Sequence, residues 1–229
     1  MIDPKSAQIG GAWQQKDASG KPCAWDPDVV AFFLDRCTAR DAPFILDIGA
    51  NTGLFCLLPV INHAVSGFAF EPNPEVYELL KRNLALNNLA GKIQTFPFAL
   101  ADKTGSVLLK IPLSGCDSGL ACLGTPMRFT LFREISVPVD TLDNILARKR
   151  VNRVDLIKID TEGCELFVLR GARETLRRFR PDIMLEYNES NTLQFGYKPD
   201  ETAHLLAEYG YSGILIGKED MFFTPPPLP

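Results

Sequence analysis

Short apolar runs alternate with segments of helical period along the chain from Pro43 onward. This alternation is typical of a sheet whose strands are joined by crossover helices, and it predicts an α/β fold. Several of the runs are apolar at every position, as in parallel strands that are covered on both faces. We therefore expect a central sheet with strands over residues 44–48, 67–71, 92–98, 154–160, 182–187 and 211–217.

Helices are predicted between these strands from capping residues and apolar spacing. The clearest one begins after Asn73, which can cap it, and Pro74 suits its first turn. We expect a second helix after Asp140, a third with inward-facing Leu and Ala side chains over 166–176, and a last one near 200–209.

The chain is long enough to bury a sizeable core, since it has 229 residues of which 46% are apolar. We expect one domain over residues 43–229, preceded by an N-terminal arm or lid over 1–42. Within that arm, DPDVVAFFLDRC reads as one amphipathic helix. Between the apolar runs SVLLKI and EISVPV lies a Gly-rich stretch that is too long for a tight turn, so residues 112–135 are predicted to be an insertion.

Charge and hydropathy argue against several classes of partner. The formal net charge of −4 disfavours the broad positive field that nonspecific nucleic-acid binding needs. The longest apolar stretch, GLFCLLPVI, is under half of the roughly 20 residues that cross a bilayer, and the N-terminus lacks a secretory pattern. We expect a cytoplasmic protein that binds neither nucleic acid nor membrane, with a homodimer left open.

The six cysteines show neither CxxC pairing nor a histidine at zinc-finger spacing, so we interpret them as reduced thiols. A redox pair between Cys116 and Cys122 is an alternative that rests on proximity in the sequence alone. The two histidines, His63 and His204, are interpreted as structural or surface groups.

The most informative segment is FILDIGANTGLF, in which a predicted strand runs into a glycine loop and then into a helix. Its pattern is Asp47-x-Gly49-x-Asn51-x-Gly53. Glycines in such a loop let the backbone approach a ligand closely. Glu71 ends the next predicted strand, where a carboxylate can accept hydrogen bonds from both ribose hydroxyls of an adenosine.

The glycine spacing separates two cofactors. A dinucleotide fingerprint has a G-x-G-x-x-G pattern, whereas this loop has Ala50 between its glycines and an aspartate two positions before the first. An acidic group facing the loop would repel phosphate but suits the ammonium of an amino acid, which favours S-adenosylmethionine. A nicotinamide-dependent oxidoreductase stays as a rival, as does a tight turn with ordinary glycines and a surface glutamate.

In six ordered blocks the chain resembles the FkbM-type S-adenosylmethionine-dependent methyltransferases. The blocks cover about two thirds of the chain and read LDIGANTG, FAFEPNPEVYELLKRNLALNNL, ALADKTG, VPVDTLDNIL, VDLIKIDTEGCELFVLRGARETLRR and RPDIMLEY. The resemblance implies a Rossmann-like class I methyltransferase fold, with a mostly parallel seven-stranded sheet whose last strand is antiparallel and with helices on both faces. It also implies methyl transfer, usually to a hydroxyl oxygen of a natural product or sugar.

The resemblance also implies roles for single residues. Asp47 and the glycine loop would hold the methionine part of the cofactor, Glu71 the ribose, and Ala99 would border the adenine. Many related enzymes have an aspartate where this chain has Phe98 and Ala99, so backbone contacts or stacking on Phe98 would replace it. Pro59 is a second departure, because it should end or kink the helix after the loop. The cofactor set is thus Asp47, Gly49, Ala50, Asn51, Gly53, Glu71, Pro72, Asn73, Phe98, Ala99 and Asp160.

A group of acids follows the strand VDLIKID. Asp160, Glu162 and Glu165 lie just beyond it, at the sheet edge where a ligand would bind, and Glu186 ends the neighbouring strand. Carboxylates that crowd together repel one another, which raises at least one pKa and suits that group to accept a proton. Asp160, Glu162 and Glu186 are therefore the candidate catalytic residues for methylation of a hydroxyl.

Two other interpretations of these acids stay open. They could cap the helix that follows, because acids favour helix N-termini. They could also bind Mg²⁺, which we do not favour, because no second Asp-Asp or Asn pattern supports it. Lys158, inside the strand, would be costly to bury unpaired, so we expect a carboxylate partner and a role in holding Asp160.

The sequence therefore predicts a cytoplasmic O-methyltransferase that acts on a small-molecule acceptor. The acceptor would contact the N-terminal arm and the Gly-rich segment over 112–128, which belongs to the insertion over 112–135 on the substrate side. A noncatalytic adenosyl-binding module on the same fold is the remaining rival.

Overall fold

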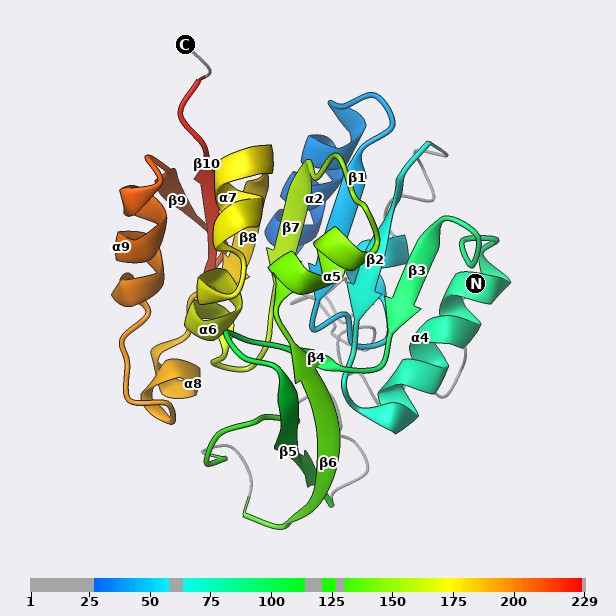
Figure 1. Cartoon of the computed structure of the whole chain (residues 1–229), viewed down its shortest axis with the longest axis vertical. Helices are drawn as coiled ribbons and strands as arrows, with labels where there is room; N and C mark the ends of the chain where they lie inside the picture. The colour runs from blue at the N-terminus through cyan, green and yellow to red at the C-terminus, as the bar shows by residue number, and fades with distance from the viewer. Residues whose placement is uncertain (1–26, 58–63, 114–120, 127–129, 228–229) are drawn as a thin grey trace, which may run out of the picture.

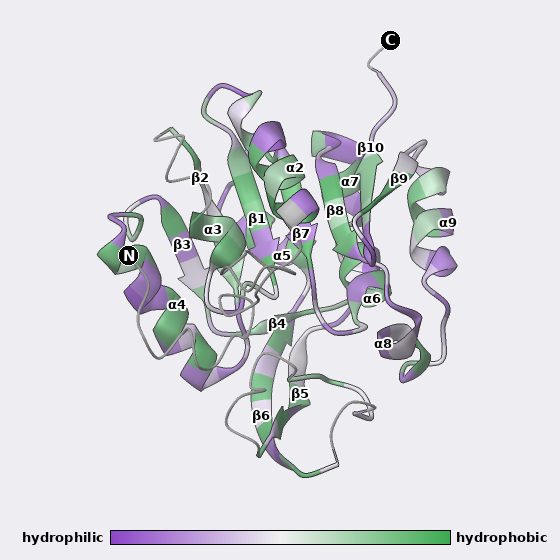
Figure 2. Ribbon diagram, turned by 180° about the vertical axis from the view of Figure 1, so that it is seen from behind, coloured by the Kyte–Doolittle hydropathy of each residue, from purple (hydrophilic) through white to green (hydrophobic). Residues whose placement is uncertain are grey.

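The computed structural model describes residues 27–57, 64–113, 121–126 and 130–227. Its main feature is a seven-stranded sheet with helices packed on both faces (Figures 1 and 2). In spatial order the strands are β3 (Ile93–Phe96), β2 (Ser66–Phe70), β1 (Phe44–Ile48), β7 (Leu156–Ile159), β8 (Asp182–Glu186), β10 (Asp220–Thr224) and β9 (Ser212–Ile216). The last strand in the sequence, β10, runs antiparallel to both of its neighbours. The predicted α/β class and the antiparallel last strand are confirmed.

The two central strands explain why their sequences are apolar throughout. All four residues of β7 are buried, as are four of the five in β1, because helices cover both faces of the sheet. The six strands predicted from apolar runs are all present with small changes at their ends. The runs over 92–98 and 154–160 are shortened most, each to a strand of four residues. At the first of them β3 ends at Phe96, before Pro97, which has no backbone N–H to donate to a ladder. The seventh strand, β10, was not located from the sequence.

Three helices pack on one face of the sheet: α2 (Pro27–Thr38), α3 (Leu54–Leu57) and α4 (Pro74–Leu86). On the other face lie α5 (Leu142–Arg148), α6 (Glu165–Arg170), α7 (Arg173–Phe179) and α9 (Asp200–Glu208). The short helix α8 (Glu189–Leu193) follows β8. No helix in the described ranges is both long and apolar enough to cross a membrane.

The helix caps follow the sequence signals. The side chain of Asn73 accepts a hydrogen bond from the Glu75 backbone N–H, and Pro74 occupies the first turn of α4, as predicted. The predicted helix over 166–176 is instead two helices, α6 and α7, because the chain breaks at Gly171. A side chain at Gly171 would lie 2.1 Å from the Ala101 carbonyl oxygen, so a second segment packs directly against the backbone there.

The amphipathic helix expected in the N-terminal arm is α2, and it belongs to the core. Val29, Phe33 and Cys37 are fully buried against the sheet. Its C-terminal end is fixed by ion pairs from Arg36 and Arg40 to Asp182, at 2.7 and 2.5 Å. Residues 1–26 of the predicted arm lie outside the described residues, so a lid there stays a prediction.

A second, three-stranded sheet lies beyond the carboxyl ends of the parallel strands (Figure 1). It has the order β4 (Ala99–Leu100), β6 (Phe132–Asp140), β5 (Gly105–Pro112). The antiparallel β5–β6 pair contains the two apolar runs that flank the Gly-rich stretch. Of that stretch, 121–126 is described, and Cys122 and Lys110 exchange backbone hydrogen bonds at 2.9 and 3.1 Å. The predicted insertion thus extends a separate sheet on the side of the strand ends.

Candidate active site

The glycine loop joins β1 to α3 at the carboxyl edge of the sheet. The Gly49 and Ala50 backbone N–H groups both donate to the Phe70 carbonyl of β2, at 3.0 and 2.9 Å. Gly49, Asn51 and Gly53 all have positive φ, at 78°, 50° and 95°. The sequence D-x-G-x-N-x-G therefore supplies residues that tolerate the left-handed region where the turn requires it.

Asp47 is buried at the end of β1, with 1% of its surface exposed. The Cys56 thiol of α3 donates to its Oδ2 across 3.0 Å. Burial raises the pKa of Asp47 to about 6, although the thiol and Lys158 both favour the charged carboxylate. A cation that binds at this end of the sheet would stabilise the ionised form of Asp47 and so lower its pKa.

Glu71 connects two loops. Its Oε2 accepts from the Asn51 backbone N–H at 2.9 Å, and its Oε1 accepts from the Asn73 backbone N–H at 2.8 Å. Burial raises the pKa of Glu71 to about 7, with Asp47 and Asp160 adding to the rise. Each carboxylate oxygen can accept more than one hydrogen bond, so a diol can bind to the same carboxylate.

The neighbours of Glu71 contribute less directly. Pro72 is half-buried, whereas Asn73 is fully buried and uses its side chain to cap α4. Asn73 thus contacts Glu71 through its backbone N–H and the start of α4 through its side chain. The sequence prediction did not distinguish this role from direct contact.

Phe98 stands where the chain leaves β3 for the second sheet. Its half-buried ring is tilted against Phe70 and Phe96, with ring centroids 5.9 and 5.4 Å apart. Ala99 is buried and pairs with Val139 in the second sheet. This geometry leaves the Phe98 ring, rather than a polar side chain, as the group at the predicted adenine position.

Lys158 is the buried cation at the centre of the site. Its Nζ lies 3.3 Å from Asp160 Oδ2 and 3.3 Å from Asp220 Oδ1, and 1% of its side chain is exposed. Burial alone would lower the pKa of Lys158, but Asp160, Asp220 and Glu186 together raise it, so the lysine is charged. The predicted carboxylate partner and the predicted link to Asp160 are confirmed. Asp220 was missed because it lies in β10.

Glu162 and Glu186 meet at one side chain that the sequence did not indicate. Asn191 Nδ2 of α8 donates to Glu162 Oε2 at 2.8 Å and to the two oxygens of Glu186 at 3.0 and 2.9 Å. Glu162 itself has a φ of 54°, which is uncommon for a residue other than glycine. The expected convergence of these two acids is thus observed. The polar run N-E-S-N after β8 was the available signal.

Glu165 is the most deeply buried of the three acids that follow β7. It is 1% exposed, and its Oε1 accepts from the backbone N–H groups of Thr161 and Gly163, at 3.0 and 3.2 Å. These bonds close the turn before α6. The alternative that the acids after β7 cap the following helix is wrong, because the N-cap of α6 is Cys164, which makes no side-chain cap bond.

A metal site finds no support in the part of the chain that the structure describes. There, no three His, Cys, Asp or Glu side chains are grouped so that they could hold a metal ion. His204 is exposed, while His63, Pro59 and Cys116 lie outside the described residues. The magnesium alternative therefore has no ligand set here.

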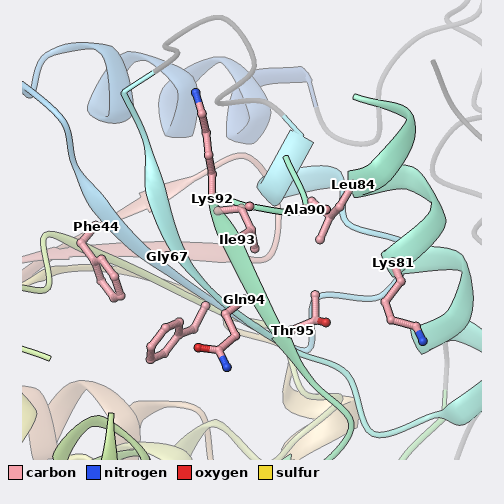
Figure 3. A pocket seen from close by; sticks show the side chains of 11 residues that line it. Phe44, Gly67, Lys81, Leu84, Ala90, Lys92, Ile93, Gln94 and Thr95 are labelled. Atoms are coloured by element: carbon pink, nitrogen blue, oxygen red, sulfur yellow. The ribbon is translucent and has the colours of Figure 1, made fainter. Parts of the chain in front are cut away.

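A surface pocket lies at the opposite end of the sheet (Figure 3). Phe44, Gly67 and Lys92, at or next to the amino ends of β1, β2 and β3, line it together with Lys81 and Leu84 of α4. It contains none of the residues predicted to bind a cofactor. The candidate active site is instead the group of loops at the carboxyl ends of β1, β2 and β7.

Comparison with known proteins gives a consistent result. Residues 47–212 match the family model described as the methyltransferase FkbM domain. The chain is 30% identical to Methyltransferase 1 of Beauveria bassiana over 219 residues, which cover 86% of this chain and 83% of that protein. It is 25% identical to the 31-O-demethyl-FK506 methyltransferase FkbM of Streptomyces tacrolimicus, covering 84% and 83%, and 25% identical to the hexuronic acid methyltransferase AglP of Haloferax volcanii, covering 86% and 72%.

Among solved structures, the methyltransferase FkbM from Methylobacillus flagellatus superposes with a TM-score of 0.54 at 19% identity. The match covers 79% of this chain but only 43% of that longer protein. The strand order, the antiparallel last strand and this similarity all identify a class I methyltransferase fold, and this fold implies S-adenosylmethionine as the cosubstrate. The family match spans the glycine loop, Glu71 and the acidic segment after β7, and the chain belongs to the FkbM family of methyltransferases.

Proposed function

We propose that this protein transfers the methyl group of S-adenosylmethionine to a hydroxyl oxygen of a small natural product or sugar. The observation that carries the proposal is the arrangement of Glu71 and the glycine loop beside a group of carboxylates held on Lys158 and Asn191. Two relatives support the acceptor class, since their names specify a 31-O-demethyl compound and a hexuronic acid.

The residues present fit the adenosyl cosubstrate. It carries an ammonium and a sulfonium and no phosphate, and the acids at the loop are the buried Asp47 and Glu71 and, across from Gly49, the half-buried Asp160. Burial raises the pKa of Asp47 and of Glu71, so a cation beside them is bound more tightly than by exposed acids. Asp47 and the loop would hold the methionine part, with Glu71 on the ribose and Phe98 against the adenine.

When bound, S-adenosylmethionine supplies a methyl group on a positively charged sulfur. The chain must hold the acceptor oxygen in line with that carbon and remove the hydroxyl proton. Asp160, Glu162 and Glu186 are the proposed residues for these tasks, since a carboxylate can accept the proton as the new bond to oxygen forms. Lys158 would hold Asp160 in place through their 3.3 Å contact.

The first test is cofactor choice. The unfolding temperature is followed in titrations with S-adenosylhomocysteine and, in parallel, with NAD. A ligand at a hundred times its dissociation constant adds about 2.7 kcal/mol, a shift of several degrees for a domain of this size. We expect a shift with S-adenosylhomocysteine alone; a shift with NAD alone would contradict the methyltransferase assignment.

The second test is the acceptor atom. Methyl-¹³C S-adenosylmethionine is incubated with hydroxyl-bearing and amine-bearing acceptors, and the product methyl carbon is identified by NMR. A methyl ether signal supports transfer to a hydroxyl oxygen, whereas an N-methyl signal or a methyl ester signal contradicts it. Binding without transfer to any acceptor would favour a noncatalytic adenosyl-binding protein.

A further inference from the structure

The Asn191 side chain contacts both Glu162 and Glu186. Its amide nitrogen lies 2.8 Å from Glu162 Oε2 and 3.0 and 2.9 Å from the Glu186 oxygens. An amide has two N–H groups, so one serves Glu162 and the other is shared by the two oxygens of Glu186. Two carboxyl groups within hydrogen-bonding distance of one nitrogen must lie close to each other.

The position of Asn191 is fixed by its surroundings. It is 3% exposed, and the Asn188 side chain that caps α8 accepts from its backbone N–H at 3.3 Å. The backbone carbonyl oxygen of Asn191 lies so close to Gly163 that a Cβ atom added at Gly163 would be 2.2 Å from it. Gln194, just after α8, donates to the Glu162 carbonyl at 2.8 Å. The α8 segment therefore holds Glu162 by both its side chain and its backbone.

The Cys122 thiol lies near Glu162, and the pKa of that thiol is raised by burial and, in addition, by the Glu162 carboxylate. Charged groups also reach the pair from several neighbouring elements. These are Lys158 of β7, Asp160 after β7, Glu165 of α6, and Asp220 of β10, which pairs in register with Glu186. Lys158 alone cannot neutralise so many acids. Burial raises the pKa of Glu186 well above its ordinary value, with Asp160, Glu162 and Glu165 adding to the rise and the Asn191 amide opposing it.

We propose that Asn191 is a positioning residue that keeps Glu162 and Glu186 together as a carboxyl pair sharing one proton, and that Glu162 takes the proton of the acceptor hydroxyl. Glu162 is the half-buried member, whereas Glu186 is 8% exposed, so the acceptor reaches Glu162 more easily. This inference rests on the proposed O-methyl transfer.

The step is balanced. The acceptor oxygen forms a bond to the methyl carbon while the carbon–sulfur bond breaks, and that electron pair stays on sulfur as a neutral thioether. The hydroxyl proton passes to the Glu162 carboxylate, so the pair, which held one proton and one negative charge before the step, becomes neutral. The proton then leaves to solvent.

The test compares Asn191→Ala with Ser190→Ala, an exposed position on the same helix. Glutamate is labelled with ¹³C at the side-chain carboxyl, and its titration is followed by NMR in the protein without acceptor. Glu162→Gln and Glu186→Gln assign the two signals. Because Asn191 donates to the charged forms, the titration of the pair should move to higher pH in Asn191→Ala and stay unchanged in Ser190→Ala.

Kinetics give the second readout. We expect kcat to fall about tenfold or more in Asn191→Ala, with little change in KM for S-adenosylmethionine, since a hydrogen bond to a charged group is lost. If Asn191→Ala folds poorly, Asn191→Ser is used in its place. Serine keeps one hydrogen-bond donor, so we expect a smaller rise in the titration pH and a smaller fall in kcat than for Asn191→Ala. Titration of the pair at the wild-type pH in both Asn191 variants would overturn the proposal. If the titration moves but no acceptor is methylated, the carboxyl pair stands and the O-methyl transfer fails.

Discussion

Gly49 and Asp160 touch at the ends of β1 and β7, so that a side chain at Gly49 would lie 1.8 Å from the Asp160 carbonyl oxygen. This contact places the glycine loop against the first residue of the acidic segment. The first glycine of the loop is thus required by packing between two strand ends as well as by its φ of 78°.

Gly49→Ala should therefore reduce both folding stability and binding of S-adenosylhomocysteine. The positive φ alone costs about 1 to 3 kcal/mol, and the clash with the Asp160 carbonyl adds to it. Chemical denaturation and calorimetry measure the two effects. The control is Gly91→Ala, where an added side chain meets no atom within 4 Å and φ is not positive. Equal effects of the two substitutions would contradict the close contact.

Glu71→Ala should weaken S-adenosylhomocysteine binding by about 1.5 to 3 kcal/mol, the usual scale for hydrogen bonds to a charged group. Part of the loss arises because the Asn51 and Asn73 backbone N–H groups lose their acceptor. Calorimetric titration measures the affinity. Glu78→Ala, an exposed residue that pairs with Lys81, is the matched control. Unchanged affinity in Glu71→Ala would remove the ribose assignment.

Stability without ligand should fall as the pH rises from about 4 to 8. Burial raises the pKa of Asp47 to about 6 and of Glu71 to about 7. Their folded-state pKa values exceed the unfolded ones, so the folded protein binds protons more tightly, and this stabilisation is fully present at low pH and is lost through pH 6 to 7. Each group contributes about 3 kcal/mol to the difference. Urea unfolding at pH 5 and pH 8 tests this, and Glu71→Gln should show a smaller pH dependence.

Affinity for S-adenosylhomocysteine should follow the opposite pH trend. Its ammonium favours the ionised carboxylates, so binding releases protons and strengthens as pH rises through 6 to 7, with a plateau above that. Calorimetry in two buffers of different ionisation enthalpy counts the protons released. Uptake of protons on binding would show that these acids do not face the cationic part of the ligand.

Lys158→Met should be strongly destabilising, by about 3 to 5 kcal/mol, because it leaves buried carboxylates without their cation. Adding Asp220→Asn should recover part of that loss, since it removes one of the uncompensated charges. Lys198→Met, at an exposed position, is the control. Additive losses in the double variant would mean that the lysine and Asp220 do not stabilise each other.

The sequence was informative where function depends on local pattern. The glycine loop, the acid at the end of β2 and the caps of α4 are each defined within a few residues, so their geometry follows from turn and helix chemistry. The fold class followed from the alternation of apolar runs, because a buried parallel sheet imposes that pattern.

The remaining features depend on contacts between distant segments. Asp220 reaches Lys158 from 62 residues away, and Asn191 reaches Glu162 from 29 residues away. The burial of Glu165 depends in part on the Tyr197 hydroxyl, 3.2 Å from its Oε2. The break between α6 and α7 at Gly171 is imposed by the Ala101 backbone. Tertiary packing decides each of these, and no local propensity reports it.

The second sheet is formed by a segment whose two ends are held together. The start and the end of this segment lie side by side, since Ala99 pairs with Val139 and the Ala101 N–H donates to the Asp140 carbonyl at 3.0 Å. Lengthening a loop between such fixed ends costs little free energy, about 0.6 kcal/mol per doubling. Residues 102–138 can therefore be exchanged as a unit without altering the register of β1, β2 and β7. We predict that such an exchange changes the choice of acceptor and leaves the affinity for S-adenosylmethionine unchanged.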